Sequence, residues 1–411
     1  MPVHPDIDAA WAEGIANLRA AQIDLTDYPL FLVLGRSAAG VENLFDSAQV
    51  PLIVRASPPE GPVQFCAGDE GIYICCPGTC AMAYQAELLA TESAPAPAED
   101  DFYQTLRPKA GQQREIQAVL ARAKKEGRPL DAKEKEELRR LSSGSKSSLL
   151  RDTDDIQALA QRLERLCQLI VEARQPYCPL NGILTLIPYP GLARPEVASQ
   201  FGQLMQQELD IVRTTLRVNC PILALICDLE TAPGFRDFIE RFPADQRQRR
   251  LGLRLPHSPD LDPEQWQDML VNAALWICQS LMPSWVYRLV RLDPPGTDTL
   301  GNASLMHLLA EFYARADNLA TILGSGIPLH PPTPPLFGGC YLAGTGADPQ
   351  HEQAFAPGVF RRLLEDQNFV SWTAEAIAED ARNQRLANLG TTVLAILTVA
   401  LASIAGFVFF R

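Results

Sequence analysis

Several hydrolase signatures are missing from this 411-residue sequence. It contains neither a Gly-x-Ser-x-Gly elbow nor a His-Glu-x-x-His helix, which excludes the common serine-hydrolase and zinc-peptidase motifs. Its five histidines are dispersed, and no second cysteine pair with zinc spacing accompanies Cys76 and Cys80. Buried thiols are therefore the stronger interpretation of that pair, and a metal or redox site is the weaker alternative. We expect no metal and no cofactor.

Positive charge is also scarce. The chain has 36 Lys and Arg against 49 Asp and Glu, a net charge of -13 and a pI near 5.0. A general nucleic-acid binder carries a basic surface, so no nucleic-acid partner is expected. The N-terminus has Asp6, Asp8 and Glu13 but no apolar core, which excludes a secretory signal. Ten cysteines scattered through apolar segments of so long a chain indicate reduced, buried thiols.

Charge is absent altogether from one stretch near the C-terminus. Residues 391–410 run for about 20 residues without a charged side chain, which matches the roughly 30 Å hydrocarbon core of a bilayer. A transmembrane helix is predicted, and a buried C-terminal helix is the alternative. Arg382 and Arg385 precede the span and only Arg411 follows it, so we expect a single-pass C-terminal anchor in the inner or cytoplasmic membrane with a cytoplasmic N-terminal body.

Short apolar runs bounded by Gly, Pro or Ser predict strands. They occur at 30–34, 51–55, 63–66, 72–76, 183–187, 222–227 and 340–343. Amphipathic helices are predicted between them, with stripes such as Leu163, Leu166 and Ile170 or Leu305, Leu309 and Phe312. Continuous apolar strands alternating with helices indicate an α/β fold whose mostly parallel sheet has helices on both faces.

Composition divides the chain into segments. The order is an N-terminal helix, a first α/β part, a charged insertion, a second α/β part, a helical subdomain with a Pro-rich connection, a last strand with juxtamembrane helices, and the membrane span. Their boundaries are 1–27, 28–91, 92–150, 151–259, 260–335, 336–389 and 391–410.

The insertion 92–150 is expected to be a mobile or partly helical segment outside the main core, because it is polar, Pro-rich and then rich in Lys and Arg. Its basic side chains either form a solvated helical surface, which is the favoured interpretation, or contact anionic lipid. They are Arg122, Lys124, Lys125, Arg128, Lys133, Lys135, Arg139 and Arg140.

One loop has the glycine spacing of a phosphate-binding site. Gly35 and Gly40 are separated by four residues, follow the apolar run 30–34 and precede a predicted helix. That layout is typical of a Walker A loop, although two glycines alone are a weak signal. The positions that should hold lysine and Ser or Thr are Val41 and Glu42.

With its companion segments, this loop resembles the N-terminal cytoplasmic domain of the IcmF/TssM family, an inner-membrane component of type VI and related type IV secretion systems. The family motifs are a GxxGxGKT-like loop, DTAGR, NGVLLTLP, TKCDLxxGF and an RGVYFTSGTQ-like strand. The similar stretches here are LVLGRSAAGVE (32–42), IYICCPGT (72–79), NGILTLIP (181–188), ALICDLETAPGF (224–235) and GGCYLAGTG (338–346). The resemblance implies a P-loop GTPase-like fold with a helical extension.

The departures from that pattern indicate lost catalysis. A Walker loop needs a lysine for the β and γ phosphates and a hydroxyl for magnesium. A Glu42 carboxylate about 4 Å from a phosphate would instead repel each unit of charge by on the order of 4 kcal/mol at an effective dielectric near 20. By the resemblance, Cys75 replaces the magnesium-supporting aspartate, Ile226 replaces the lysine that lies along guanine, and Asp228 retains the base-reading position. The degenerate nucleotide cleft comprises Gly35, Gly40, Val41, Glu42, Cys75, Gly78 and Asp228.

Together these features predict a membrane-anchored scaffold or binding module with an inactive GTPase-like domain and no catalytic residue. Protein partners in a membrane-associated complex are expected, and a bound nucleotide is not. The alternative is an atypical nucleotide-binding or GTP-hydrolysing membrane protein that uses Gly35, Gly40, the amides between them and Asp228.

Overall fold

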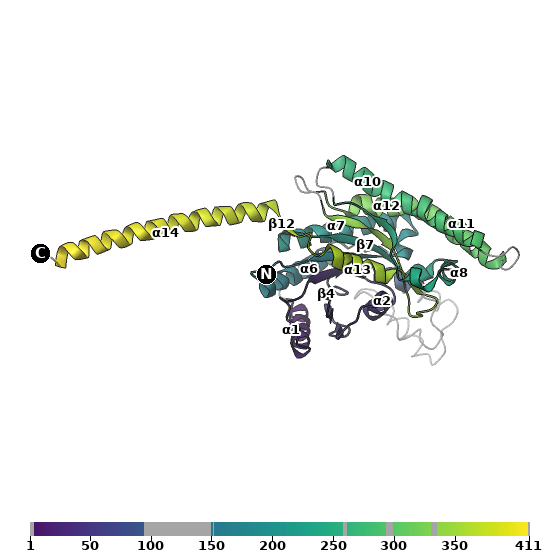
Figure 1. Cartoon of the computed structure of the whole chain (residues 1–411), viewed down its shortest axis with the longest axis horizontal. Coiled ribbons are helices and arrows are strands. Elements are labelled where there is room, and N and C mark those ends of the chain that lie inside the picture. The colour runs from purple at the N-terminus through teal and green to yellow at the C-terminus, as the bar shows by residue number, and fades with distance from the viewer. Residues whose placement is uncertain are drawn as a thin grey trace, which may run out of the picture.

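The computed structural model describes residues 4–93, 149–150, 152–257, 261–292, 299–329 and 335–409. Most of these residues form one body built around a single large sheet, and the last helix leaves that body (Figure 1). The insertion expected at 92–150, with all eight basic residues named above, lies almost entirely outside the described residues. So does the middle of the Pro-rich connection, 330–334.

The sheet has eight strands in the order β2-β3-β4-β1-β5-β7-β9-β8. Two small antiparallel pairs, β6 with β12 and β10 with β11, lie outside it. The strands of the main sheet are β1 Leu30–Leu34, β2 Val54–Ser57, β3 Gln64–Gly68, β4 Gly71–Cys75, β5 Gly182–Pro188, β7 Ile222–Cys227, β8 Leu251–Arg254 and β9 Phe337–Leu342. The small pairs use β6 Val218–Asn219, β12 Ser371–Trp372, β10 Gly344–Thr345 and β11 Gln353–Ala354.

The predicted mostly parallel α/β sheet is confirmed at its centre and modified at its edges. Strands β4, β1, β5, β7 and β9 are parallel to one another. Strand β3 pairs antiparallel with both β2 and β4, and β8 pairs antiparallel with β9. The connection from Gly68 to Gly71 is too short for a crossover, so β3 and β4 can only form a hairpin. Strand β8 was not predicted, and β2 begins at Val54 rather than at Pro51, which has no N–H to donate to the ladder.

Helices cover both faces of the sheet, as predicted. Along β1, Leu30, Leu32 and Leu34 enter the larger core cluster, whereas Phe31 and Val33 enter a second cluster. This alternation follows from the two-residue period of a strand. The larger cluster includes α1, α3, α6, α7, α10 and α12, and the second includes α2 and α13.

The helices contain the amphipathic stripes seen in the sequence. In α6, Leu163, Leu166 and Ile170 are buried, and the Asp152 carboxylate accepts a hydrogen bond from the amide of Asp154 at 3.1 Å to cap the first turn. The helices are α1 Pro5–Ala20, α2 Gly40–Ala48, α3 Ala81–Ser93, α6 Thr153–Arg174, α7 Pro195–Leu216, α8 Phe235–Glu240, α9 Ala244–Arg247, α10 Pro263–Trp276, α11 Met282–Leu292, α12 Thr299–Gly326, α13 Ala356–Asp366 and α14 Ala374–Phe409. A π-helical turn, Ile277–Leu281, joins α10 to α11.

Among the described residues, two helical stretches are long and apolar enough to cross a membrane. The most apolar 18 residues of Pro263–Leu292 have a mean hydropathy of 1.2 and are 44% buried inside the protein, whereas those of Ala374–Ile404 have a mean hydropathy of 1.8 and none is buried. Figure 1 shows α14, which contains the second stretch, extending away from the body. The first stretch thus packs partly into the core of the body. The C-terminal stretch is a candidate membrane span, because its apolar side chains are not buried by the described part of the chain.

Candidate functional site

The loop with Walker A spacing lies at the point where the strand order reverses. Strand β1 has β4 on one side and β5 on the other, and residues 35–39 connect its carboxyl end to α2. In open α/β sheets, ligands bind outside the carboxyl ends of the strands at this switch point. The fold therefore puts the loop where a ligand-binding loop belongs.

Both glycines of the loop have left-handed backbone conformations. Gly35 has φ +91°, and a Cβ there would lie 2.4 Å from the carbonyl oxygen of Leu186, so only glycine fits. Gly40 has φ +89° but open space around it. The first glycine is required by close backbone approach and the second by the turn into α2.

The two substituted positions form the first turn of α2. Val41 is half-buried and packs against the second core cluster, while Glu42 is exposed. A valine in this place contributes to the core and offers no cation. The Glu42 carboxylate faces solvent near a helix N-terminus, where the helix dipole favours negative charge.

The carboxylate of Asp228 occupies the inner side of the loop. Its Oδ1 accepts a hydrogen bond from the Ser37 hydroxyl at 2.6 Å, and the amide of Ala38 lies 3.1 and 3.0 Å from Oδ1 and Oδ2. The Thr345 hydroxyl, which follows β9, lies 3.1 Å from the same Oδ1. A carboxylate on loop amides and hydroxyls is the arrangement expected for a bound anion, and here the chain itself supplies the anion.

Burial of the Asp228 carboxylate shifts its pKa. Asp228 is 0% exposed, and that burial raises its pKa, although the hydrogen bonds from Ser37, Ala38 and Thr345 lower it. Glu230, whose Oε2 accepts the Thr345 amide at 3.0 Å, has its pKa raised to about 7 by burial and by the charge of Asp228. Because Asp228 faces the loop and not solvent, it does not present its carboxylate to a nucleotide base. This differs from the base-reading position that the resemblance implied.

The loop after β4 forms the other wall of the site. Cys80 Sγ accepts the Gly35 amide at 3.2 Å, and Gly78 lies so close to Pro62 that a Cβ would meet it at 2.8 Å. Cys75 points the other way, into the second core cluster, and burial beside Cys66 raises its pKa well above the usual value. Cys75 is thus a core residue.

A buried glutamate fixes this wall to α7. Glu208 Oε1 accepts the amides of Ala81 and Met82 at the start of α3, the second at 3.2 Å. Burial raises the Glu208 pKa to about 8.

All ten cysteines are free, and nine of them are buried, as the sequence predicted. Sequence reasoning missed Glu208, Glu230 and Thr345, because only the tertiary contacts distinguish them.

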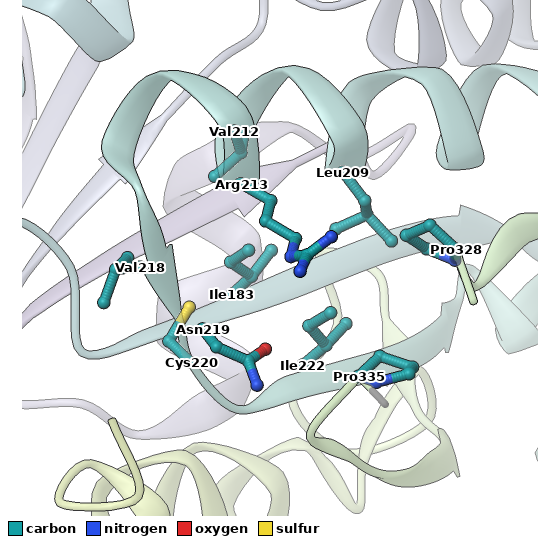
Figure 2. Close-up of a pocket in the computed structure, with 10 residues that line it drawn as sticks. All are labelled: Ile183, Leu209, Val212, Arg213, Val218, Asn219, Cys220, Ile222, Pro328 and Pro335. Carbon is teal, nitrogen blue, oxygen red and sulfur yellow. The ribbon is translucent and has the colours of Figure 1, made fainter. Parts of the chain in front are cut away.

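A separate small cavity lies at the opposite edge of the sheet. It is lined by α7, by the beginnings of β5 and β7, and by Pro328 and Pro335; its lining includes Arg213 and Asn219 (Figure 2). Figure 2 shows the Arg213 side chain directed over the start of β7. The cavity volume is about 20 Å³, which is room for roughly one water molecule. It is too small for a nucleotide.

A comparison with known protein families identifies the family of this chain. The model of the IcmF-related N-terminal domain matches residues 157–366, about half of the sequence. The chain belongs to the IcmF-related family. No curated protein and no solved structure matched it.

The matched range of the IcmF-related domain runs from α6 to the end of α13. It therefore contains Asp228, Glu230 and Thr345, but it begins after the loop Gly35–Gly40 and after Cys75 and Gly78. The family assignment agrees with the resemblance given by the segments at 181–188, 224–235 and 338–346.

Proposed function

We propose that this IcmF-related protein is a membrane-anchored, catalytically inactive GTPase-like scaffold, a TssM-like component of a type VI secretion system. Members of the family are membrane-associated and work in multi-protein secretion complexes, which favours protein partners for this chain. The GTPase-like character is supported by the glycine loop at the switch point of the sheet. Its inactivity is supported by the contents of that loop.

The observation that carries this proposal is the bond between Ala38 and Asp228. In a nucleotide site, backbone amides of the loop receive phosphate oxygens. Here that amide is taken by Asp228 at 3.0 Å, and Glu230 lies behind the same carboxylate, its Oε2 on the amide of Thr345. A phosphate entering about 4 Å from a charged Asp228 would be repelled by on the order of 4 kcal/mol per unit of charge at an effective dielectric near 20. No lysine at position 41 offsets that repulsion.

The anchor rests on the exposure of α14. Its side chains at Leu394, Ile396 and Leu397 are 65, 64 and 54% exposed, although they belong to the most apolar part of the chain. Each buried CH₂ contributes about 0.8 kcal/mol when removed from water, so such a helix is stable only in a bilayer or against a partner. The Arg217–Glu379 ion pair and the β6–β12 pair join the start of the helix to the body.

Titration of full-length protein in a neutral detergent with fluorescent GTP and ATP tests the inactive site. We expect no saturable binding of either nucleotide, with or without magnesium. Submicromolar affinity, or GTP hydrolysis that Asp228→Asn abolishes, would show that the site works. Recovery of the full-length protein in the soluble fraction without detergent would contradict the anchor separately.

Affinity capture from detergent-solubilised membranes tests the scaffold role. Baseplate or sheath components of a secretion apparatus are expected among the captured proteins. Their capture must survive Val41→Ala, which shortens a half-buried side chain at the former lysine position and changes no charge. Recovery of no such component would oppose the assignment to a secretion system.

A further inference from the structure

Two adjoining cavities form a groove beside α13. They have volumes of about 190 and 240 Å³ and share Gln49, Gln248 and Pro357 in their walls. The groove lies between the end of α2, α9 and the start of α13. Arg247 lines the first cavity and Arg361 the second. We call these two cavities, with the adjacent exposed Arg249 and Arg250, the arginine groove.

The charge of its two lining arginines is held in place but not neutralised. The Arg247 guanidinium donates to the carbonyl oxygens of Phe242, Gln350 and Glu240 at 3.1, 3.2 and 3.2 Å. The Arg361 guanidinium donates to the carbonyl oxygens of Gln248 at 2.6 Å and Pro357 at 3.3 Å. Carbonyl oxygens fix the orientation of a guanidinium without cancelling its charge, so both side chains remain suited to a carboxylate.

The flanking arginines add positive charge at the rim. Within the part of the chain that the structure describes, Arg249 has one weak ion pair, with Asp245 at 3.5 Å, and both side chains are mostly exposed, at 74 and 68%. An exposed pair of this kind contributes little, with a median of about 0–1 kcal/mol. Among the lining residues in the described part of the chain, Glu70 is the single acidic one. The groove is therefore positively charged in a chain whose net charge is -13.

Between the charges the second cavity has apolar walls, whereas the first is lined largely by polar side chains such as Ser47, Gln49 and Gln353. Val50, Pro51, Phe360 and Leu364 line the second cavity, and Ala354 lines the first. An occupant therefore needs apolar side chains as well as negative charge. A protein segment that alternates acidic and apolar residues meets both requirements, whereas inorganic anions or a polyanion without apolar groups meet only one.

The position of the groove decides between a protein and a lipid surface. Helix α13 begins beside the groove at Ala356, ends at Asp366, and leads through β12 into α14. Its 11 residues span roughly 16 Å at 1.5 Å per residue. Figure 1 shows α14 leaving the body on the side away from α8, which precedes the arginine-rich segment. Given the proposed anchor, the first 17 residues of α14 (374–390) span roughly 25 Å between the body and the uncharged stretch at 391–410, which favours a protein over lipid headgroups as the occupant.

We propose that the arginine groove docks an acidic, partly apolar segment of a cytoplasmic protein partner. The guanidinium groups of Arg247 and Arg361 receive carboxylates inside the cavities. Arg249 and Arg250 attract the segment and hold further acidic side chains at the rim. Because α2 ends in this groove and begins at the glycine loop, the partner contacts the helix that follows that loop without needing a nucleotide.

A defined peptide tests the groove in the full-length protein in neutral detergent. The probe is a fluorescein-labelled peptide of alternating Glu and Leu, and its counterpart alternates Lys and Leu at the same length. Fluorescence anisotropy should give saturable binding of the Glu/Leu peptide, weakened by salt, and none of the Lys/Leu peptide. Absence of saturable Glu/Leu binding, or equal binding of both peptides, overturns the proposal.

Charge reversal locates the contact. The double variant R249E/R250E alters two exposed side chains, neither of which donates to a backbone carbonyl among the described contacts, so the fold should persist. We expect it to weaken Glu/Leu binding by about tenfold or more. The matched control R19E/R291E makes the same change in net charge on α1 and α11. Its affinity for the Glu/Leu peptide should stay within about twofold of the wild-type value. Equal weakening in both variants would mean long-range charge rather than a groove.

Nanodiscs distinguish a lipid from a protein ligand. The same titration in discs of phosphatidylcholine, with and without phosphatidylglycerol, should give one affinity for the Glu/Leu peptide. Competition by the anionic lipid, lost in R249E/R250E, would identify the groove as a membrane contact and overturn the protein assignment. None of these outcomes depends on nucleotide binding, so the proposal can fail while the inactive-GTPase assignment stands.

Discussion

Replacing Asp228 by glycine removes the carboxylate from the loop and leaves the donors of Ser37, Ala38 and Thr345 without their acceptor. Each unsatisfied buried donor costs about 1–3 kcal/mol. Two effects offset this cost: Asp228 has φ +61°, which glycine adopts more easily, and burial of its charge is itself unfavourable, as its raised pKa indicates. We therefore expect a net loss of about 2 kcal/mol of unfolding free energy, or roughly 2–3 °C in Tm for a chain of this length.

The informative measurement is chemical rescue. The vacated loop should bind inorganic phosphate or acetate, because its amide and hydroxyls still converge on one point. Thermal unfolding of the full-length D228G protein in neutral detergent should show a Tm that rises with either anion above the value in chloride of equal ionic strength. At 100 times the dissociation constant, the gain is about 2.7 kcal/mol, enough to restore the wild-type Tm.

Glu60→Gly is the matched control. Glu60 is also acidic and has φ +59°, but it is exposed and lies in the turn before β3. Its variant should show no anion-specific gain. An equal response of wild type, E60G and D228G to phosphate, or no response of a folded D228G, would refute the idea that Asp228 serves as the anion of the loop.

Three further predictions follow from the same contacts. Burial gives Glu208 a folded pKa of about 8 against an ordinary value of 4.5, so the fold loses stability as pH rises from about 4.5 to about 8 and the carboxyl must ionise. Glu208→Gln should flatten this pH dependence of the unfolding free energy, by at most about 5 kcal/mol, in denaturant titrations across the same range. An unchanged slope would contradict the assignment. Gly35→Ala should lower the unfolding free energy by about 2 kcal/mol or more, because the added Cβ meets the Leu186 carbonyl oxygen. Gly40→Ala places its Cβ in open space and should lower it by about 1 kcal/mol. Equal losses of the two variants in urea titrations would argue against the loop geometry. Leu397→Arg places a charge in the candidate span at a cost of about 2.5–3.5 kcal/mol and should shift protein from the carbonate-resistant membrane fraction to the soluble fraction, while the conservative Leu397→Ile should not.

The general fold was readable from the sequence because strands and helices impose short periods. The run Leu30–Leu34 is apolar at every position, which a strand buried on both faces requires, and the structure has β1 at those residues. The Ile222–Cys227 run is likewise β7. The antiparallel edges were not readable in this way. Pairing direction depends on how far the chain must travel between strands, and the edge position of β8 depends on β9, which lies more than 80 residues later.

The candidate site was readable only in part. The glycines and the unusual Val41 and Glu42 are local features, and the loop is where their spacing put it. The contact of Asp228 with Ala38 joins residues 190 positions apart, and nothing in the local sequence of either residue specifies it. Cys75 was assigned to the cleft because, by the resemblance, it stands where the magnesium-supporting aspartate would be, but strand alternation turns its side chain into the core.

By itself, the sequence determined the alternation of strands and helices, the glycine loop and the uncharged C-terminal stretch, because each depends on residues close together in the chain. Tertiary structure decided which groups meet: that the loop holds the carboxylate of Asp228, that Cys75 faces the core, and that four arginines gather around one groove. The physical reason is that hydrogen bonds and charges act over a few ångströms in space, and only the folded sheet brings distant segments within that range.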